Sequence, residues 1–165
     1  MNVIARKRSR HSGLGFTLIE MLAVVAVMAL LATIAVPLTE IHRKRGQEEE
    51  LRRALREIRT GLDTHKKLVD QGRVARPIDG SEFPASLDVL VNGVQDMQSK
   101  TGARIFILRQ LPRDPFASPE VPAAETWSLR SYESPPDNPR PGRDVFDVRS
   151  KALGVGLNGV PYTKW

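Results

Sequence analysis

The stretch that organises this sequence is Gly15-Phe16-Thr17-Leu18-Ile19-Glu20, which opens an apolar segment that runs to Val36. Between positions 16 and 36, 18 of 21 residues are apolar. An α-helix rises about 1.5 Å per residue, so this segment predicts a transmembrane helix over 16–36. Glu20 does not fit a plain span, because a carboxylate one turn into such a helix is costly in lipid unless its charge has a partner.

A short basic leader over 1–15 precedes the apolar segment and contributes four cations, Arg6, Lys7, Arg8 and Arg10. A basic start followed by an apolar run also occurs in cleaved secretory signals. Here the run is long, contains Glu20, and ends in Ala35-Val36-Pro37 without a clear small-residue cleavage site. A plain membrane anchor explains the length of the run but leaves Glu20 unexplained.

Composition narrows the classes of function. The formal net charge is +6, and a chain that begins at Phe16 carries 6 − 4 = +2 before its new amino terminus is counted. The basic character is therefore partly a property of the leader, which weakens any inference to nucleic-acid binding. The sequence has no cysteine, so a disulfide framework and thiolate chemistry are excluded.

A basic leader that ends in Gly15, followed by Phe-Thr-Leu-Ile-Glu and an apolar helix, resembles the amino terminus of the type IV pilin and pseudopilin family. The resemblance implies that a prepilin peptidase cuts between Gly15 and Phe16 and methylates the new amino group of Phe16. In a filament, Glu20 of one subunit would pair with that amine of a neighbour, since lipid solvates both charges poorly. Glu20 would then favour particular axial offsets between subunits. The alternative is that Glu20 only reaches the lipid headgroups.

Pro37 closes the apolar segment, and we expect the helix to kink or loosen there because proline lacks an N–H and crowds the preceding turn. In the family that the sequence resembles, melting at this place is thought to help subunits fit into a filament. Residues 37–72 predict an amphipathic continuation of the same helix. Its apolar stripe comprises Leu51, Ala54, Leu55, Ile58, Leu62 and Val69. His65 lies on this stripe and is expected to be packed, or exposed at its edge, rather than to bind metal.

Two blocks of opposite charge occupy this continuation, at 43–45 and at 48–50. They form either a solvated face or ion pairs between neighbouring subunits, and the pattern leaves both readings open. Gly72 is suited to the end of the helix.

Residues 73–165 predict a small globular head. A short helix is expected at 86–91, strands at 103–110, 127–132 and 144–150, and a tight turn at Asn158-Gly159. For 103–110, a helical turn is the alternative to a strand. The predicted fold class is α+β, with a long amino-terminal helix, half transmembrane and half amphipathic, packed on a small antiparallel sheet. This order of elements is pilin-like and resembles the major pseudopilin of type II secretion from end to end.

One motif in the head strengthens that resemblance. Leu111-Pro112-Arg113-Asp114-Pro115-Phe116 contains two prolines that enforce an extended turn, and Asp114 can cap the turn with its carboxylate. The hexapeptide resembles the Leu-Pro-x-Asp-Pro-aromatic motif of the major pseudopilin of type II secretion.

That pseudopilin usually binds calcium in the loop after its last long strand, but residues 151–165 here contain no Asp or Glu. Calcium requires several oxygen ligands, normally with carboxylates among them. We therefore expect no tight calcium site. Either the chain is a divergent branch, or packing around Asn158-Gly159 and Trp165 replaces the metal.

Catalytic chemistry is not indicated. The three histidines are His11, His42 and His65, and neither a metal-ligand spacing nor a nucleophile–base arrangement is present. Asp144 and Asp147 flank a predicted strand on opposite faces, which does not suit paired acid–base work. The glycine pattern at 154–159 leaves only six residues after it, too few for a dinucleotide-binding helix. We expect no enzyme, no cofactor, no metal and no small-molecule substrate.

The resemblance implies a pseudopilin held by a single pass in the bacterial inner membrane, with its head in the periplasm. Its partners would be prepilin peptidase, further copies of itself, other pseudopilins and the inner-membrane assembly platform. A pilin of a type IV pilus or competence system shares the amino-terminal motif and is the nearest alternative. A DNA-binding minor pilin, using Arg140, Arg143, Arg149 and Lys151, is disfavoured by the core-like positions of the few aromatic residues. A third alternative is a solitary membrane-anchored domain, in which Glu20 would have no role in assembly.

Overall fold

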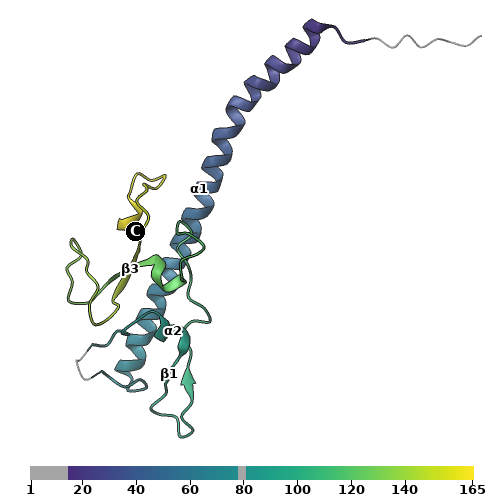
Figure 1. Cartoon of the computed structure of the whole chain (residues 1–165). Coiled ribbons are helices and arrows are strands. Elements are labelled where there is room, and N and C mark those ends of the chain that lie inside the picture. Colours follow the sequence, from purple (N-terminus) through teal and green to yellow (C-terminus); the bar gives the residue numbers. More distant parts are fainter. Residues whose placement is uncertain (1–14, 78–80) are drawn as a thin grey trace, which may run out of the picture. The chain divides into compact units, whose positions relative to one another are not determined.

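The structure, a computed structural model, describes residues 15–77 and 81–165, with the backbone alone at 34–38. The predicted leader, up to residue 14, therefore lies outside the described residues. The chain divides into two compact units, Met1–His42 and Arg43–Trp165. Helix α1, Leu18–Asp70, contributes to both units (Figure 1).

In the first unit, the described chain leads into the amino-terminal part of α1. The helix continues through Pro37, and its helical backbone is unbroken from Leu18 to Asp70. The predicted continuation past the proline is confirmed, whereas the kink or loosening stays a prediction. The sequence predicts a transmembrane helix over 16–36. Within residues 15–77 and 81–165, no helix is both long enough and apolar enough to cross a membrane.

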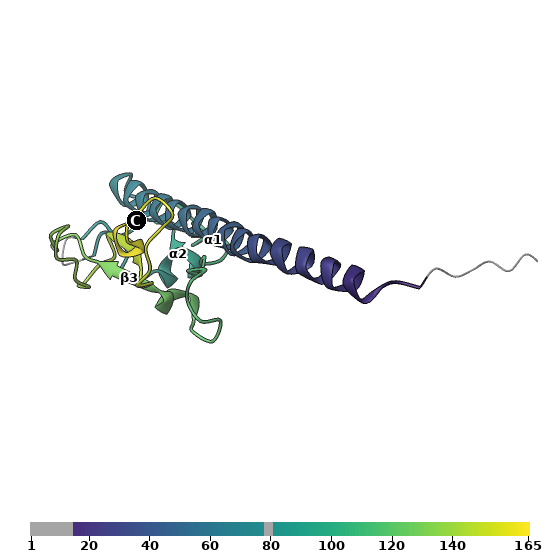
Figure 2. The same ribbon diagram turned by 90° about the horizontal axis from the view of Figure 1, so that it is seen from above.

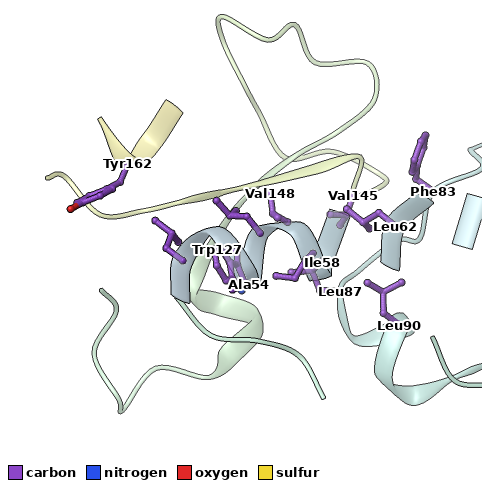
Figure 3. Packing of buried hydrophobic residues seen from close by; sticks show 12 residues of the cluster. Ala54, Ile58, Leu62, Phe83, Leu87, Leu90, Trp127, Val145, Val148 and Tyr162 are labelled. Atoms are coloured by element: carbon purple, nitrogen blue, oxygen red, sulfur yellow. The ribbon is translucent and has the colours of Figure 1, made fainter. Parts of the chain in front are cut away.

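In the second unit, α1 forms one side of the hydrophobic core. The predicted apolar stripe is confirmed, since all six of its residues are buried: Leu51, Ala54, Leu55, Ile58, Leu62 and Val69. Figure 3 shows Ala54, Ile58 and Leu62 among the residues that meet them from the head, which include Leu87, Leu90, Trp127, Val145 and Val148. His65 is also buried, so it is packed and not exposed at the edge of the stripe, and its Nδ1 lies 3.1 Å from the carbonyl oxygen of Glu82.

Gly72 ends α1 as its sequence position predicts. Its φ of +66° lies in the left-handed region, where glycine has no Cβ to clash. The Gly72 N–H donates to the carbonyl of Val69 at 2.9 Å, and the Arg73 N–H donates to that of Leu68 at 2.9 Å. These bonds satisfy carbonyls that the helix end would otherwise leave open.

The first sheet is smaller than the sequence predicts. Helix α2, Asp88–Asn92, is followed by β1, Val94–Gln95, which pairs antiparallel with β2, Arg104–Ile105. The strand predicted over 103–110 is wrong beyond Ile105. There the N–H groups of Ile107 and Leu108 both donate to the carbonyl of Leu90, at 3.1 and 2.9 Å. The backbone thus caps α2 instead of extending a ladder.

The second sheet pairs β3, Trp127–Arg130, with β4, Asp147–Ser150, and η1, Ala123–Thr126, precedes it. The pairing is antiparallel and includes Leu129 opposite Val148. Over the described residues, the head therefore has two separate two-stranded sheets in place of the one predicted. The strand predicted from residue 144 begins later because the N–H of Val145 donates to the carbonyl of Pro84 at 2.8 Å.

The chain finishes in a carboxyl-terminal hairpin (residues 153–161) and a short helix, η2, Tyr162–Lys164. Val155 and Pro161 form an antiparallel bridge, and Gly159 turns the chain with a φ of +78°. The predicted tight turn at Asn158-Gly159 is confirmed. This hairpin, yellow in Figures 1 and 2, lies along α1 in the second unit and contacts Lys44 and Glu48.

Candidate processing and assembly site

The start of α1 is set by Thr17. The Glu20 N–H donates to Thr17 Oγ1 at 3.2 Å, and the Met21 N–H donates to the Thr17 carbonyl at 3.1 Å. Thr-Leu-Ile-Glu is a capping-box pattern, in which a hydroxyl at the helix start satisfies an otherwise open N–H. Our sequence interpretation did not use this signal, although the four residues carry it.

Gly15 and Phe16 lie just before the helix. Both residues are exposed, and Phe16 is 73% exposed. A Cβ at Gly15 would meet no atom within 4 Å. The predicted cleavage bond between them is therefore accessible, and it stands outside the helix that Thr17 begins.

The three polar side chains of the apolar segment differ in whether they have a hydrogen-bond partner. Thr17 caps the helix, and Thr33 Oγ1 donates to the carbonyl of Ala29 at 2.9 Å. Within residues 15–77 and 81–165, the Glu20 carboxylate makes neither a hydrogen bond nor an ion pair. The positive end of the helix dipole favours a carboxylate in this first turn, but it does not replace a partner.

The amino-terminal part of α1 exposes apolar side chains around its whole circumference. The large apolar residues that are exposed are Leu18, Ile19, Met21, Leu22, Val24, Val25, Val27, Met28, Leu30 and Leu31. A helix that is apolar on every side is stable where lipid or other helices cover it. The rest of the described chain leaves these side chains exposed.

Residues 11–36 match the family model described as the prokaryotic N-terminal methylation motif. The chain carries the signature of the type IV pilin family. This motif suggests a pilin-like or pseudopilin protein that prepilin peptidase processes and that assembles with copies of itself, and it implies membrane anchoring. Comparisons with curated proteins and with solved structures find no match. The matched residues include Gly15, Phe16 and Glu20, and none of the head.

In the head, α1 holds the carboxyl-terminal hairpin through polar contacts. Lys44 Nζ donates to the carbonyl of Val155 at 2.8 Å. The carboxylate of Glu48 accepts the N–H of Leu157 at 2.7 Å and the hydroxyl of Tyr162 at 3.0 Å. Glu48 is only 3% exposed, so the reading of 48–50 as an entirely solvated or inter-subunit block is wrong for this residue.

Trp165 closes the hairpin against α1. The Arg52 guanidinium lies 4.4 Å from the centre of the Trp165 ring, and Arg59 donates to the main-chain oxygen of Trp165 at 2.9 Å. The indole N–H donates to the carbonyl of Val160 at 3.2 Å. A Cβ at Gly156 would lie 2.5 Å from the indole, so only glycine lets the two segments approach this closely.

Tyr162 connects the hairpin to the proline-rich motif. Its ring stacks on Phe116 with centroids 4.4 Å apart. Burial, together with the hydrogen bond to Glu48, raises the pKa of the Tyr162 phenol to about 12. The neutral phenol is therefore the form that the fold stabilises.

The carboxylate of Asp114 joins the same motif to β4. It accepts the N–H of Phe116 at 2.8 Å, which confirms the predicted cap, and it also accepts the hydroxyl of Ser150. The indole N–H of Trp127 donates to the carbonyl of Pro112 at 2.9 Å. The motif thus links its own turn to the second sheet through these hydrogen bonds.

Asp144 and Asp147 have separate partners, so the structure does not bring them together as an acid–base pair. Asp144 is buried and accepts hydrogen bonds from the hydroxyls of Ser81 and Ser131, at 2.6 and 2.7 Å. Asp147 pairs with Arg59 Nε at 2.9 Å. In the described part of the chain, no group of three or more Asp, Glu or His side chains is placed to hold a metal ion.

Three of the four cations in the predicted basic patch bind partners within the head. Arg143 pairs with Glu133, Arg149 donates to the carbonyl of Pro136, and Lys151 donates to that of Glu125. The contacts of Arg143 and Arg149 are with the loop before β4, and that of Lys151 is with η1, so each of these three cations is engaged within the head.

Proposed function

We propose that this chain is a pseudopilin subunit, which is cut after Gly15, methylated on Phe16 and polymerised into a periplasmic filament that assists protein export by type II secretion. One observation carries the proposal. The methylation motif opens an exposed apolar helix in which Glu20 is the polar side chain left without a partner among the described residues.

The chemistry of assembly follows from cleavage. Cutting after Gly15 creates a cationic amine on Phe16, directly before the Thr17 cap that begins the helix. The amine of one subunit and the Glu20 carboxylate of the next then form an ion pair in a poorly hydrated environment. At a separation of about 4 Å and an effective dielectric constant near 20, their attraction is about 4 kcal/mol. Because this attraction needs a particular stagger, Glu20 selects the axial offset, while burial of apolar helix surface supplies most of the assembly energy.

We propose that the segment 16–36 anchors the chain by a single pass in the bacterial inner membrane, with the head in the periplasm. Prepilin peptidase, other pseudopilins and the inner-membrane assembly platform are the partners. The chain has a structural role and is the substrate of an enzyme rather than an enzyme itself, without a cofactor. The type II assignment rests on the resemblance of Leu111–Phe116 to the Leu-Pro-x-Asp-Pro-aromatic motif, whose Asp114 carboxylate here binds the Phe116 N–H and the Ser150 hydroxyl.

A subunit of a type IV pilus or competence system is the alternative, because the amino-terminal motif is common to both kinds of filament. Deletion of the gene separates the two. Loss of protein export with normal pilus function favours secretion, and the reverse result favours a pilus.

The decisive experiment replaces Glu20 with alanine in the full chain. We expect cleavage and methylation of Phe16 to continue, as read by mass spectrometry of the amino terminus, while filaments disappear from electron micrographs. Glu49→Ala, at an exposed carboxylate of the same helix, is the matched control and should leave filaments intact. Gly15→Leu should instead stop cleavage. Filaments of Glu20→Ala at wild-type yield would contradict the proposed pairing.

A further inference from the structure

The carboxyl-terminal hairpin presents apolar side chains that the head leaves uncovered. Leu153 is 97% exposed, and Val155, Leu157 and Val160 are 47%, 45% and 39% exposed. We call these four residues the hairpin surface. Leu153, the first residue of the hairpin, is almost fully exposed and therefore adds little to the packing of the head, so an exposed apolar group of this kind suggests an external binding surface.

The charges around the hairpin surface are mainly positive. Lys151 and Lys164 flank it, and residues 151–165 contain no Asp or Glu. The basic block 43–45 joins them, since Lys44 binds the carbonyl of Val155. The exposed carboxylates on the next turn of α1 are Glu49 and Glu50. The hairpin surface therefore combines exposed apolar side chains with an excess of nearby cations.

The sequence limits the distance between the end of the apolar segment and the residue of α1 that contacts the hairpin. Lys44, which contacts the hairpin, lies eight residues after Val36, where the apolar segment ends. Eight residues reach at most about 28 Å, whatever conformation they adopt. By contrast, the other end of the head lies 26 residues further along α1, at Asp70, which is about 39 Å in a helix.

We propose that the hairpin surface docks on the headgroup region of a membrane that contains anionic phospholipids. Leu153 enters the boundary with the acyl chains, and Lys164 contacts lipid phosphates. This is how other surface-bound elements combine apolar insertion with attraction to anionic lipid. A second copy of the same surface fits less well, because its cations would face like charges. The proposal rests on the membrane anchoring proposed above. Docking of the hairpin surface would hold the head of an unassembled subunit against the membrane.

The absence of cysteine allows single spin labels to test this in the full chain, reconstituted in phosphatidylcholine vesicles with or without phosphatidylglycerol. Labels are placed by Leu153→Cys, by Met97→Cys as a matched exposed position, and by Val24→Cys in the apolar segment. Met97 is 58% exposed, and its N–H binds the carbonyl of Arg73, near the carboxyl end of α1. Collision with a water-soluble nickel complex reports exposure of each label to water.

We expect the label at position 153 to be protected from the nickel complex in vesicles with phosphatidylglycerol, while the label at 97 stays accessible. Lys164→Gln should lower the docked-to-undocked ratio about fivefold, the effect of one cation at an anionic surface, and Lys100→Gln near Met97 should not. Because Leu153 is almost fully exposed, its replacement should leave the fold intact.

A water-exposed label at 153 with a lipid-protected label at 24 would overturn the docking and leave the anchoring standing. Exposure of both labels would overturn the anchoring and the docking together. Equal protection without phosphatidylglycerol would overturn the role of anionic lipid. Spin–spin broadening at 153 that disappears on dilution with unlabelled chain would identify a second copy as the occupant and overturn the lipid proposal.

Discussion

Replacing Glu48 with alanine tests whether one buried carboxylate holds the carboxyl-terminal hairpin to α1. Glu48 is 3% exposed, and one of its oxygens accepts both the Leu157 N–H and the Tyr162 hydroxyl. Arg52 is 3.8 Å from its other oxygen. The substitution leaves two donors without their acceptor in a closely packed region.

The expected loss of stability follows from those two donors. A buried donor left unpaired costs about 1–3 kcal/mol. Leu157 is 45% exposed and its N–H can recruit water, whereas Tyr162 is 2% exposed and cannot do so without rearrangement. We therefore expect Glu48→Ala to lower the free energy of unfolding by about 3 kcal/mol, the sum of a small and a large penalty. For a unit of this size, the midpoint of thermal unfolding should fall by about 10 °C.

Thermal and denaturant unfolding of the full chain in detergent, followed by tryptophan fluorescence, measures this loss. Glu49→Ala changes an exposed neighbour on the same helix and should cost less than about 0.5 kcal/mol. Tyr162→Phe removes one donor, so its effect should largely vanish when Glu48 is already alanine, with a coupling energy of about 1 kcal/mol. A loss below about 0.5 kcal/mol for Glu48→Ala, or additive effects in the double variant, would refute the reasoning.

Two further predictions concern pH. The raised pKa of Tyr162 means that its contribution to stability is complete below pH 10.0 and is lost as the pH rises toward about 12. Denaturant unfolding at alkaline pH should show this loss, and Tyr162→Phe should remove it; an unchanged alkaline limb in that variant would contradict the assignment. Burial raises the pKa of Asp144, but hydrogen bonds from Ser81, the Tyr132 N–H and Ser131, with the charge of Arg143, outweigh it and place the pKa below its ordinary value of 3.8. Its contribution is thus present above that value and lost as the pH falls through the lowered pKa, so Asp144→Asn should be less stable at neutral pH and lose less on acidification. Identical acid limbs for wild type and variant would count against it.

Local features of the chain were predictable because they depend on neighbours in sequence. The stripe from Leu51 to Val69 has the helical period, and burial of its members confirms the register. Gly72 ends the helix because a left-handed conformation suits glycine. The processing motif is likewise a contiguous run, which the family comparison recovers over 11–36.

The strands were harder to predict because each is short and half of its pairing lies elsewhere in the chain. The run 103–110 has the composition of a strand, yet the open carbonyl of Leu90 attracts the N–H groups of Ile107 and Leu108. Strands were predicted at 127–132 and 144–150, and both formed in part, as Trp127–Arg130 and Asp147–Ser150, in a sheet separate from β1 and β2. A sequence does not reveal which carbonyl will compete for a given N–H.

Glu48 illustrates the limit of what the sequence pattern predicts and what only the tertiary structure decides. Glu48 lies three residues before Leu51, but the block of three glutamates was predicted either to be solvated or to form ion pairs between subunits. Its partners, Leu157 and Tyr162, come from 109 and 114 residues further along the chain. Helical periodicity depends only on residues a few positions apart in the chain. The sequence alone therefore specified the apolar segment, the stripe and the helix end. Only the folded head brings distant donors to a buried carboxylate, because burial and hydrogen bonding must be satisfied together.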